Sequence, residues 1–528
     1  MNTCHFFAIA AVLPLLASAA VHPVFESGPV QTPPNPPTTP SEQIDQFVFD
    51  QLAERNLQPA NLCSDAVFLR RAHLCVIGTL PTEQETRAFL DATDPDRRSR
   101  LIDELLKRDE FADYWSMKWG DLLRVKAEFP IKLWPNAVQA YHRWIHTSLR
   151  DNKPIHDFVR QMLVGNGSNF REGEVNFYRA MQDRSPRGIA ATVALTFMGE
   201  RAEKWPTKKL DAMAGFFAQV NFKPTAEWKE EIVYFDPMAD KEALWRGAMF
   251  PDGTPGDLKL GLQDPRVVFA DWLLRPENPW FSRNIANRAW SWLMGRGIVH
   301  EPDDNRPDNP PSNPELLAFL EKEFAASRCD MKHLFRIILN SQTFQLSSIP
   351  AQDSEEAAVH FAHYPLRRME AEVLIDALNQ LTRTQESYSS PIPEPFSFIP
   401  ENIRAISLAD GSITSSFLEL FGKPPRDTGY ESERGRNVSD AQRLHLLNST
   451  HVHKKVAVSP LVEAAHDGES TPEEIADKVY HTVLSRPPTP DEVNALKTHA
   501  AEDYAGAREL AADLVWALIN EPEFFFIH

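Results

Sequence analysis

The sequence predicts a mainly α-helical protein of two multi-helical domains, with repeated helical units and few short strands. Three observations support this fold class. Apolar residues recur at helical spacing, as in Ile44, Phe47, Val48 and Leu52 of the segment EQIDQFVFDQL. Strand-type alternation is scarce. The 528 residues exceed the size at which a single core stops growing, so at least two domains are expected.

Residues 1–20 are typical of a secretory signal peptide. An apolar core from Phe6 to about Leu16 precedes the small residues Ala17, Ser18 and Ala19, where such signals are cleaved. An uncleaved anchor is the alternative, but the apolar run is short for a bilayer span. Residues 21–41 are a proline-rich tether without apolar periodicity. We therefore expect an exported protein, periplasmic or extracellular, with no transmembrane segment after signal removal.

Helix start signals divide the rest of the chain. We expect folded structure to begin at Ser41, as the cap of the first helix. Ser/Thr-x-x-Glu capping boxes predict further helix starts at Thr82–Glu85, Ser312–Glu315, Thr471–Glu474 and Thr489–Glu492. We assign an N-terminal domain to residues 42–235, a linker to 236–265 and a C-terminal domain to 266–528. Any small strands are expected near the irregular stretch 384–425.

One helical unit occurs three times. The segments LIDELLKRDEF, LFRIILNSQTF and LVWALINEPEF, which start at Leu101, Leu334 and Leu514, share apolar residues at positions one, two, five and six, followed by a phenylalanine. This spacing places the apolar residues on one helical face. Chance similarity between leucine-rich helices is the alternative. In either case the unit is expected to pack in the core and to carry no chemistry.

Composition excludes several classes of function. Apolar residues make up 42% and charged residues 24%, as in an ordinary globular protein, and the net charge is −19. This charge argues against nucleic acid or an anionic membrane as the main partner. Without the signal, Cys63, Cys75 and Cys329 remain, with no C-x-x-C pair, so neither a disulfide framework nor a thiolate zinc site is predicted. A Cys63–Cys75 bridge stays open, but buried free thiols are favoured.

Histidines form two candidate metal-ligating groups. His142 and His146 are four residues apart, a spacing that lets two imidazoles share a metal ion on one helix face. His445, His451 and His453 lie close together in LHLLNSTHVHKK. Packing or surface roles are favoured for both groups, so no metal site is predicted.

An acidic, proline-rich segment supplies candidate ligand-binding residues. HEPDDNRPDNPPSNPE brings Asp303 and Asp304 close to Arg306 ahead of a predicted helix. Clustered carboxylates could hold Ca²⁺ or a sugar hydroxyl, although a network that rigidifies the turn is favoured. G-x-S-x-G, H-E-x-x-H, Walker and dinucleotide-binding motifs are absent, so catalytic residues stay unknown.

Several segments resemble a known family. IDQFVFDQLAERNLQPA, LRRAHLCVIGTLPTEQETRAFL and LIDELLKRDEFADYWSMKWGDLLR resemble the first of two domains of unknown function, of the PSCyt and PSD type, in planctomycete cytochrome-associated exported proteins. WLLRPENPWFSRNIANRAWSWLMGRGIVHEPDDNRPDNPPSNPELLAFL and PLRRMEAEVLIDALNQL resemble the second. The resemblance runs from Ile44 to His528. It implies an exported protein linked to c-type cytochrome domains, with no established reaction.

The chain departs from this family at its haem motif. Typical relatives carry C-x-x-C-H before a tryptophan and a Phe-Phe pair, matched here by Trp205 and Phe216-Phe217. Gapless matching places Ala194 and Phe197 at the two cysteines and Met198 at the histidine. Covalent haem attachment needs two thiols and an axial imidazole. Haem is therefore expected in typical relatives and predicted absent here, with no other cofactor.

A second departure concerns a C-x-C-E-R motif of the relatives. Tyr430 and Ser432 stand at its cysteines, while Glu433 and Arg434 are retained. The loss of both thiol sites suggests that they served one purpose. Glu433 and Arg434 join the candidate ligand-binding residues, which are then Asp303, Asp304, Arg306, Glu433 and Arg434.

Two classes of function remain open. We expect an exported non-haem helical binding or scaffold protein, whose partner is an unknown extracytoplasmic protein or polysaccharide. The alternative is an extracellular enzyme acting on complex carbohydrate through acidic residues of the C-terminal domain, which would need two carboxylates across a cleft. Haem-linked electron transfer is implied by the family but opposed by Ala194, Phe197 and Met198.

Overall fold

The computed structural model describes residues 21–239, 247–256, 258, 263–466, 469–502 and 506–528. The predicted signal peptide lies outside these residues, as do residues 240–246, 257 and 259–262 of the predicted linker 236–265. No helix in the described ranges is both long enough and apolar enough to span a membrane.

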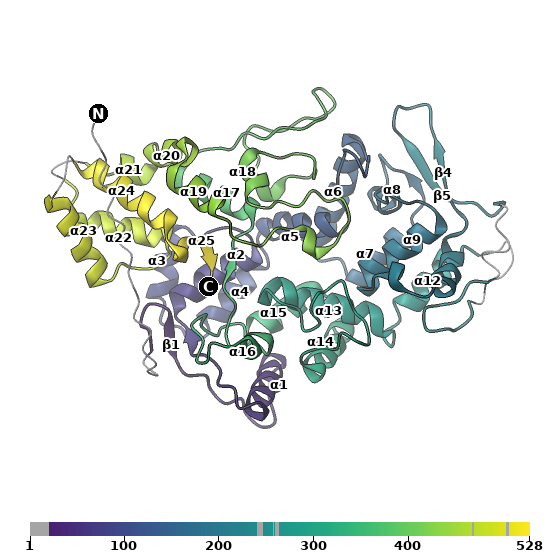
Figure 1. The fold of residues 1–528 in the computed structure, drawn as a ribbon, viewed down its shortest axis with the longest axis horizontal. Coiled ribbons are helices and arrows are strands. Elements are labelled where there is room, and N and C mark those ends of the chain that lie inside the picture. The colour runs from purple at the N-terminus through teal and green to yellow at the C-terminus, as the bar shows by residue number, and fades with distance from the viewer. Residues whose placement is uncertain (1–20, 240–246, 257, 259–262, 467–468, 503–505) are drawn as a thin grey trace.

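Helices dominate both halves of the chain, as predicted (Figure 1). The first half contains α1 (Pro40–Glu54), α2 (Asp65–Val76), α3 (Glu83–Asp91), α4 (Arg97–Leu105), α5 (Asp109–Leu122), α6 (Pro135–Arg150), α7 (Ile155–Val164), α8 (Asn176–Arg179), α9 (Pro186–Val193) and α10 (Thr207–Ala214). The second half contains α12 (Pro265–Leu273), α13 (Pro279–Met294), α14 (Pro314–Ala326), α15 (Met331–Leu339), α16 (Glu355–Val359), α17 (Ala371–Thr382), α18 (Ser416–Leu420), α19 (Asp440–Asn448), α20 (Thr450–Ala457), α21 (Pro460–Glu463), α22 (Pro472–Val483), α23 (Pro490–Glu502), α24 (Ala507–Asn520) and α25 (Pro522–Phe525).

Strands are short and antiparallel in the described chain. β1 (Glu26–Gly28) pairs with β2 (Leu62–Cys63), and β6 (Arg367–Arg368) pairs with β7 (Phe526–Ile527). A three-stranded sheet has the order β3 (Gly167–Ser168), β5 (Glu231–Phe235), β4 (Val220–Pro224). Contrary to expectation, the stretch 384–425 contains no named strand and contributes only the bridge between Ser389 and Thr414.

Proline positions explain two errors in the predicted helix starts. α1 begins at Pro40 and is capped by Thr39 with Glu42, not by Ser41. α14 begins at Pro314 and is capped by Asn313, not by Ser312 with Glu315. Proline suits the first helical position because it needs no N–H donor there, so the residue before it becomes the cap. The boxes at Thr82, Thr471 and Thr489 form as predicted.

The predicted tether is partly anchored to the folded body. β1 lies within it and pairs with β2, and the Phe25 ring lies 5.7 Å from the His528 ring. Gln31 and Gln342 exchange two hydrogen bonds, of 2.7 and 2.8 Å. Residues 22–39 therefore do not form a free spacer along their whole length.

The two halves of the chain share one continuous hydrophobic core. α1 packs against α14 and α15, and α3 packs against α22. Two buried arginines of α2 reach the second half, where Arg70 donates to the carbonyl of Phe524 at 3.1 Å and Arg71 donates to the carbonyl of Phe344. The two halves of the chain are thus joined in one packed body.

The repeated units supply much of this core. In all three copies the apolar positions are buried or half-buried, and the closing phenylalanines Phe111, Phe344 and Phe524 are buried. Each phenylalanine follows its helix after a tight turn. The units therefore pack in the core, as the sequence predicted.

Cys63, Cys75 and Cys329 are free thiols in the structure, and the first two are buried. The Cys75 thiol lies 2.8 Å from the guanidinium of Arg367. The Cys63–Cys75 bridge that the sequence left open is not formed.

Candidate functional site

The loop 424–436 carries two of the predicted residues into the interior between α5 and α17. Arg434 is buried and donates to Asp121 at 2.7 and 3.1 Å and to Glu372 at 2.6 and 3.1 Å. Burial alone would lower the pKa of Arg434, but the charges of Asp121 and Glu372 outweigh it and hold the pKa well above its usual value. Arg434 is therefore a permanently charged crosslink within the fold.

Glu433 closes a turn of the same loop. Its Oε1 atom accepts hydrogen bonds from the backbone N–H groups of Asp427 at 2.9 Å and Thr428 at 3.0 Å. Burial raises the pKa of this carboxyl. These contacts indicate that Glu433 stabilises the turn of this loop.

Asp303 is fully buried in an ion pair. It accepts from Arg288 of α13 at 2.5 Å and from the backbone N–H of Glu431 at 2.6 Å. Arg288 also donates to the carbonyl of Leu195 at 3.3 Å. Asp303 therefore joins three separate segments and has no exposed oxygen for a ligand.

Asp304 and Arg306 lie outside this interior network. Arg306 Nε is 2.7 Å from Asp304 Oδ1, and Lys204 Nζ is 3.8 Å from Asp304 Oδ2. The structure therefore connects Asp303 to the loop of Glu433 and Arg434, but it leaves Asp304 and Arg306 in a separate pair nearer the surface.

The positions matched to the haem motif form a π-helical turn, Ala194–Met198, in which all three side chains are fully buried. The Phe197 ring packs 5.1 Å from Phe177. Gly199 follows with φ +67°, and a Cβ there would lie 2.6 Å from the Asn305 amide. Ala194, Phe197 and Met198 supply neither thiol nor imidazole, so this turn does not fit covalent haem attachment.

The segment that follows the π-helical turn lies against the loop of Tyr430. The Tyr430 hydroxyl donates to Glu203 at 2.8 Å, and the Arg201 guanidinium lies 4.9 Å from the centre of the Tyr430 ring. Burial and the neighbouring Glu203 raise the pKa of Tyr430 to about 12. The contact joins residues 201–203 to the loop that carries Glu433 and Arg434. That the two matched thiol sites served one purpose stays a prediction.

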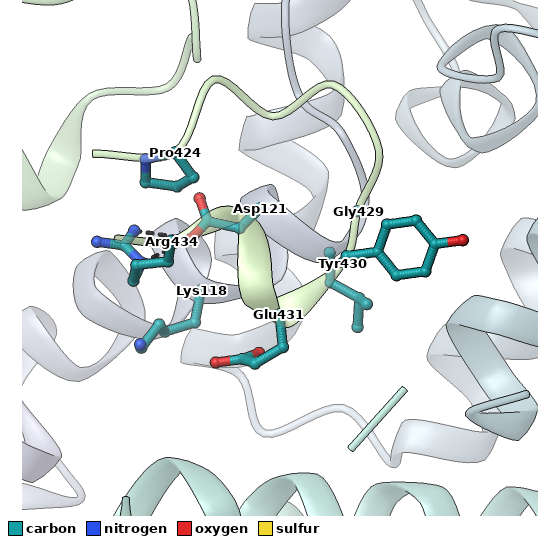
Figure 2. Close-up of a pocket in the computed structure, with 8 residues that line it drawn as sticks. Lys118, Asp121, Pro424, Gly429, Tyr430, Glu431 and Arg434 are labelled. Atoms are coloured by element: carbon teal, nitrogen blue, oxygen red, sulfur yellow. Dashed lines mark hydrogen bonds and ion pairs between the residues drawn. The ribbon is translucent and has the colours of Figure 1, made fainter. Parts of the chain in front are cut away.

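A narrow pocket opens beside this loop. Figure 2 shows Lys118, Asp121, Tyr430, Glu431 and Arg434 around it, with the Tyr430 hydroxyl pointing away from Arg434. Its water-accessible volume is about 10 Å³. Such a space holds about one water molecule. The pocket therefore cannot enclose a sugar ring in this conformation.

The rings of the first histidine pair, His142 and His146, have their centres 6.1 Å apart. His146 bonds Asp113 at 3.1 Å. Loss of surrounding water lowers the pKa of His142 to about 3, so its ring is neutral. In the described ranges, no three or more His, Cys, Asp or Glu side chains are grouped so that they could hold a metal ion.

An exposed aromatic patch escaped the sequence prediction. We define it as Trp134, Trp228 and Phe396, with Phe129 and Phe398 on the same loops. The Trp134 ring lies 4.6 Å from Trp228 and 5.8 Å from Phe396, and Trp228 lies 5.5 Å from Phe396. Most tryptophan and phenylalanine side chains in the described chain are buried or half-buried. The exposed ones are Phe129, Trp228, Phe396 and Phe398.

Three loops hold the aromatic patch in place. The loop 127–134 is closed by a bond from Trp134 N–H to the Ala127 carbonyl at 3.2 Å. The hairpin between β4 and β5 carries Trp228, and Lys229 Nζ lies 5.6 and 5.5 Å from the centres of the Trp134 and Trp228 rings. The sequence gives only a weak signal for this patch. That signal is the presence of aromatic residues within the polar or proline-rich segments EFPIKLWP, AEWKEE and PEPFSFIP.

Comparison with protein families finds two matches. Residues 43–221 match PSCyt2, described as a protein of unknown function (DUF1549), and residues 265–500 match PSD1, described as a protein of unknown function (DUF1553). Neither a curated protein nor a solved structure gives a significant match.

Proposed function

We propose that this chain, which belongs to the planctomycete cytochrome-associated proteins with paired PSCyt2 and PSD1 domains, is an exported non-haem binding protein that holds a neutral polysaccharide on its aromatic patch. The aromatic patch is the observation that carries this proposal. Binding residues concentrate on loops that a rigid scaffold positions. Export is supported by the signal-like residues 1–20.

The rings form one connected apolar surface with differently inclined faces: Trp134 meets Trp228 at 77°, and Phe396 is inclined to them by 56° and 58°. Trp134, Trp228 and Phe396 already pack against one another, so little side-chain freedom is lost on binding. Aromatic rings provide a broad apolar face, and the indole N–H of tryptophan is a hydrogen-bond donor. The carbon-bound hydrogens of a sugar ring can lie on such faces while its hydroxyls reach the polar rim.

Charge favours a neutral polymer over an acidic one. The net charge of the chain is −19, which repels polyanions over long range. Around the patch, Lys132 and Lys229 are offset by the exposed carboxylates of Glu227 and Glu394. This mixed rim supplies donors and acceptors for hydroxyl groups.

The interior offers little support for the carbohydrate-active enzyme. Asp303 is fully buried and paired with Arg288, and the pocket near Arg434 has room for about one water molecule. A hydrolase needs two carboxyl groups that reach the same glycosidic bond. The proposal therefore places ligand binding on the surface.

Co-sedimentation with insoluble cellulose, chitin and mannan tests the proposal. The mature chain is expected to bind at least one of them, and Trp228→Ala and Phe396→Ala to weaken that binding by about tenfold or more. Ile349→Ala, which removes an exposed apolar side chain elsewhere, is the control. Equal binding by all variants would rule out the aromatic patch, and capture of a protein alone would favour a protein partner.

An absorbance spectrum tests the non-haem part of the proposal. The protein is produced with its native leader in a host that attaches c-type haem. No Soret band is expected, because Ala194, Phe197 and Met198 offer no thioether or imidazole bond. A Soret band that survives denaturation would contradict the proposal.

A further inference from the structure

Two of the three clustered histidines come from consecutive helices that meet at one residue. His445 lies in the last turn of α19 and His451 in the first turn of α20. Ser449 adopts extended backbone angles between them and accepts the N–H of Val452 through its side chain at 3.2 Å. This cap breaks the helix, and the break brings the two imidazoles together.

The facing ring nitrogens have the separation of a chelating pair. His445 Nε2 lies 3.4 Å from His451 Nδ1. Two nitrogens bound to one tetrahedral metal ion at about 2.0–2.1 Å lie about 3.3–3.4 Å apart.

Glu386 fixes the orientation that metal binding requires. His451 Nε2 lies 2.8 Å from Glu386 Oε2, so His451 donates there and its Nδ1 lone pair faces His445. Metal-binding histidines commonly donate their second nitrogen to a carboxylate in this way. Lys455 lies 3.5 Å from the same Glu386 oxygen and bonds Asn379 at 2.7 Å, which holds the carboxylate in place.

One aromatic ring also packs against both histidines. The Phe417 ring lies 5.6 Å from His445 and 5.8 Å from His451, with both contacts edge-to-face. His453 takes no part, because its Nε2 faces the Leu447 carbonyl at 3.2 Å.

We propose that His445 Nε2 and His451 Nδ1 bind one divalent transition-metal ion of the zinc and copper class, with water completing its coordination and Glu386 orienting His451. The described chain provides no third His, Cys, Asp or Glu ligand there, so positions on the ion stay open to water or an external ligand. This site revises the sequence-based expectation of no metal, and it does not depend on polysaccharide binding.

Calorimetric titration of the untagged, metal-free mature chain with Zn²⁺, and separately with Cu²⁺, tests this site. One ion per chain is expected, and His445→Gln or His451→Gln should abolish this one-to-one binding. Glu386→Gln should weaken it by about 10- to 100-fold, as for other outer-shell partners. The matched control His453→Gln should bind like the wild type.

Electron paramagnetic resonance of the Cu²⁺-loaded wild type gives a readout that does not depend on variant folding. Coupling to two imidazole nitrogens is expected. Wild-type protein that binds no ion, coupling to a single nitrogen, or full affinity in folded His445→Gln protein would each overturn the proposal. Equal loss in His453→Gln would indicate scattered surface histidines and would also overturn it.

Discussion

The interior network around Arg434 and the exposed aromatic patch invert the usual distribution of side chains. Asp303 and Arg434 are buried charges, whereas Trp228 is 56% exposed and Phe398 is 74% exposed. The buried charges are paired with Arg288, Asp121 and Glu372, so their interactions are used within the fold. The exposed rings retain free faces. A charged side chain in a sequence therefore does not by itself mark a binding site, because its interactions can be used within the fold.

The charges in the interior act as ties between segments distant in sequence. Asp121 of α5 accepts from both Arg426 and Arg434, and Lys118 of α5 pairs with Glu370 at the start of α17. Burying such charges is costly unless every partner is present. The network thus fixes how the loop 424–436 of the second half packs against α5 of the first half.

Removal of Asp303 should give the largest effect on stability. Asp303→Ala leaves Arg288 buried without its charge partner, which should lower the free energy of unfolding by about 3–5 kcal/mol. Asp304→Ala, which removes a neighbouring carboxylate from a partly exposed pair, should lower it by less than about 1 kcal/mol. Denaturant unfolding of both variants measures the contrast. Equal losses would contradict the distinction between these adjacent residues.

A smaller and pH-dependent effect is expected at Glu370. Burial raises its pKa, but the charges of Lys118 and Arg434 outweigh burial and lower the pKa from 4.5 to about 2. The ionised group therefore stabilises the fold fully above pH 4.5, and this stabilisation is lost as the pH falls from 4.5 towards 2.

Glu370→Gln should accordingly lower the free energy of unfolding by about 1.5–3 kcal/mol at pH 7. The difference from wild type should narrow at pH 4, where the carboxylate begins to protonate in the unfolded chain. Unfolding curves at the two pH values give the comparison. A constant difference would show that the charge of Glu370 is not the stabilising feature.

The smallest effect on stability is expected in the aromatic patch. Trp228→Ala removes a side chain that is more than half exposed, so the free energy of unfolding should change by less than about 1 kcal/mol. Thermal unfolding provides the measurement. A loss comparable to that of Asp303→Ala would mean that the patch is part of the structural core.

Sequence reasoning captured the helical fold class and the repeated units because these depend on local spacing. Four apolar positions and a phenylalanine in each unit suffice to predict a buried helix face. It failed at Ser41 and Ser312, where the proline one or two residues away decided the cap. It also could not show that α1 packs on α14 and α15, because that contact joins residues far apart in sequence.

Prediction of the candidate functional residues is limited in the same way, because their contacts join residues from separate segments. Asp303 and Arg434 are candidates because of their chemistry, but only the fold reveals that each is buried and paired with an opposite charge. Trp134, Trp228 and Phe396 come from three loops, and no single segment records their contact. The contact between His445 and His451 was easier to predict, because both residues lie in one short segment. The contact between Glu386 and His451 could not be predicted from the sequence.

Affinity for the polysaccharide identified by co-sedimentation tests the central claim most directly. We expect Trp228→Ala to raise its Kd by about tenfold or more while the unfolding temperature stays near that of the wild type. Asp304→Ala should leave the Kd unchanged. An unchanged Kd in folded Trp228→Ala protein, together with a raised Kd in Asp304→Ala, would move the binding site from the exposed rings to the acidic loop and contradict the account.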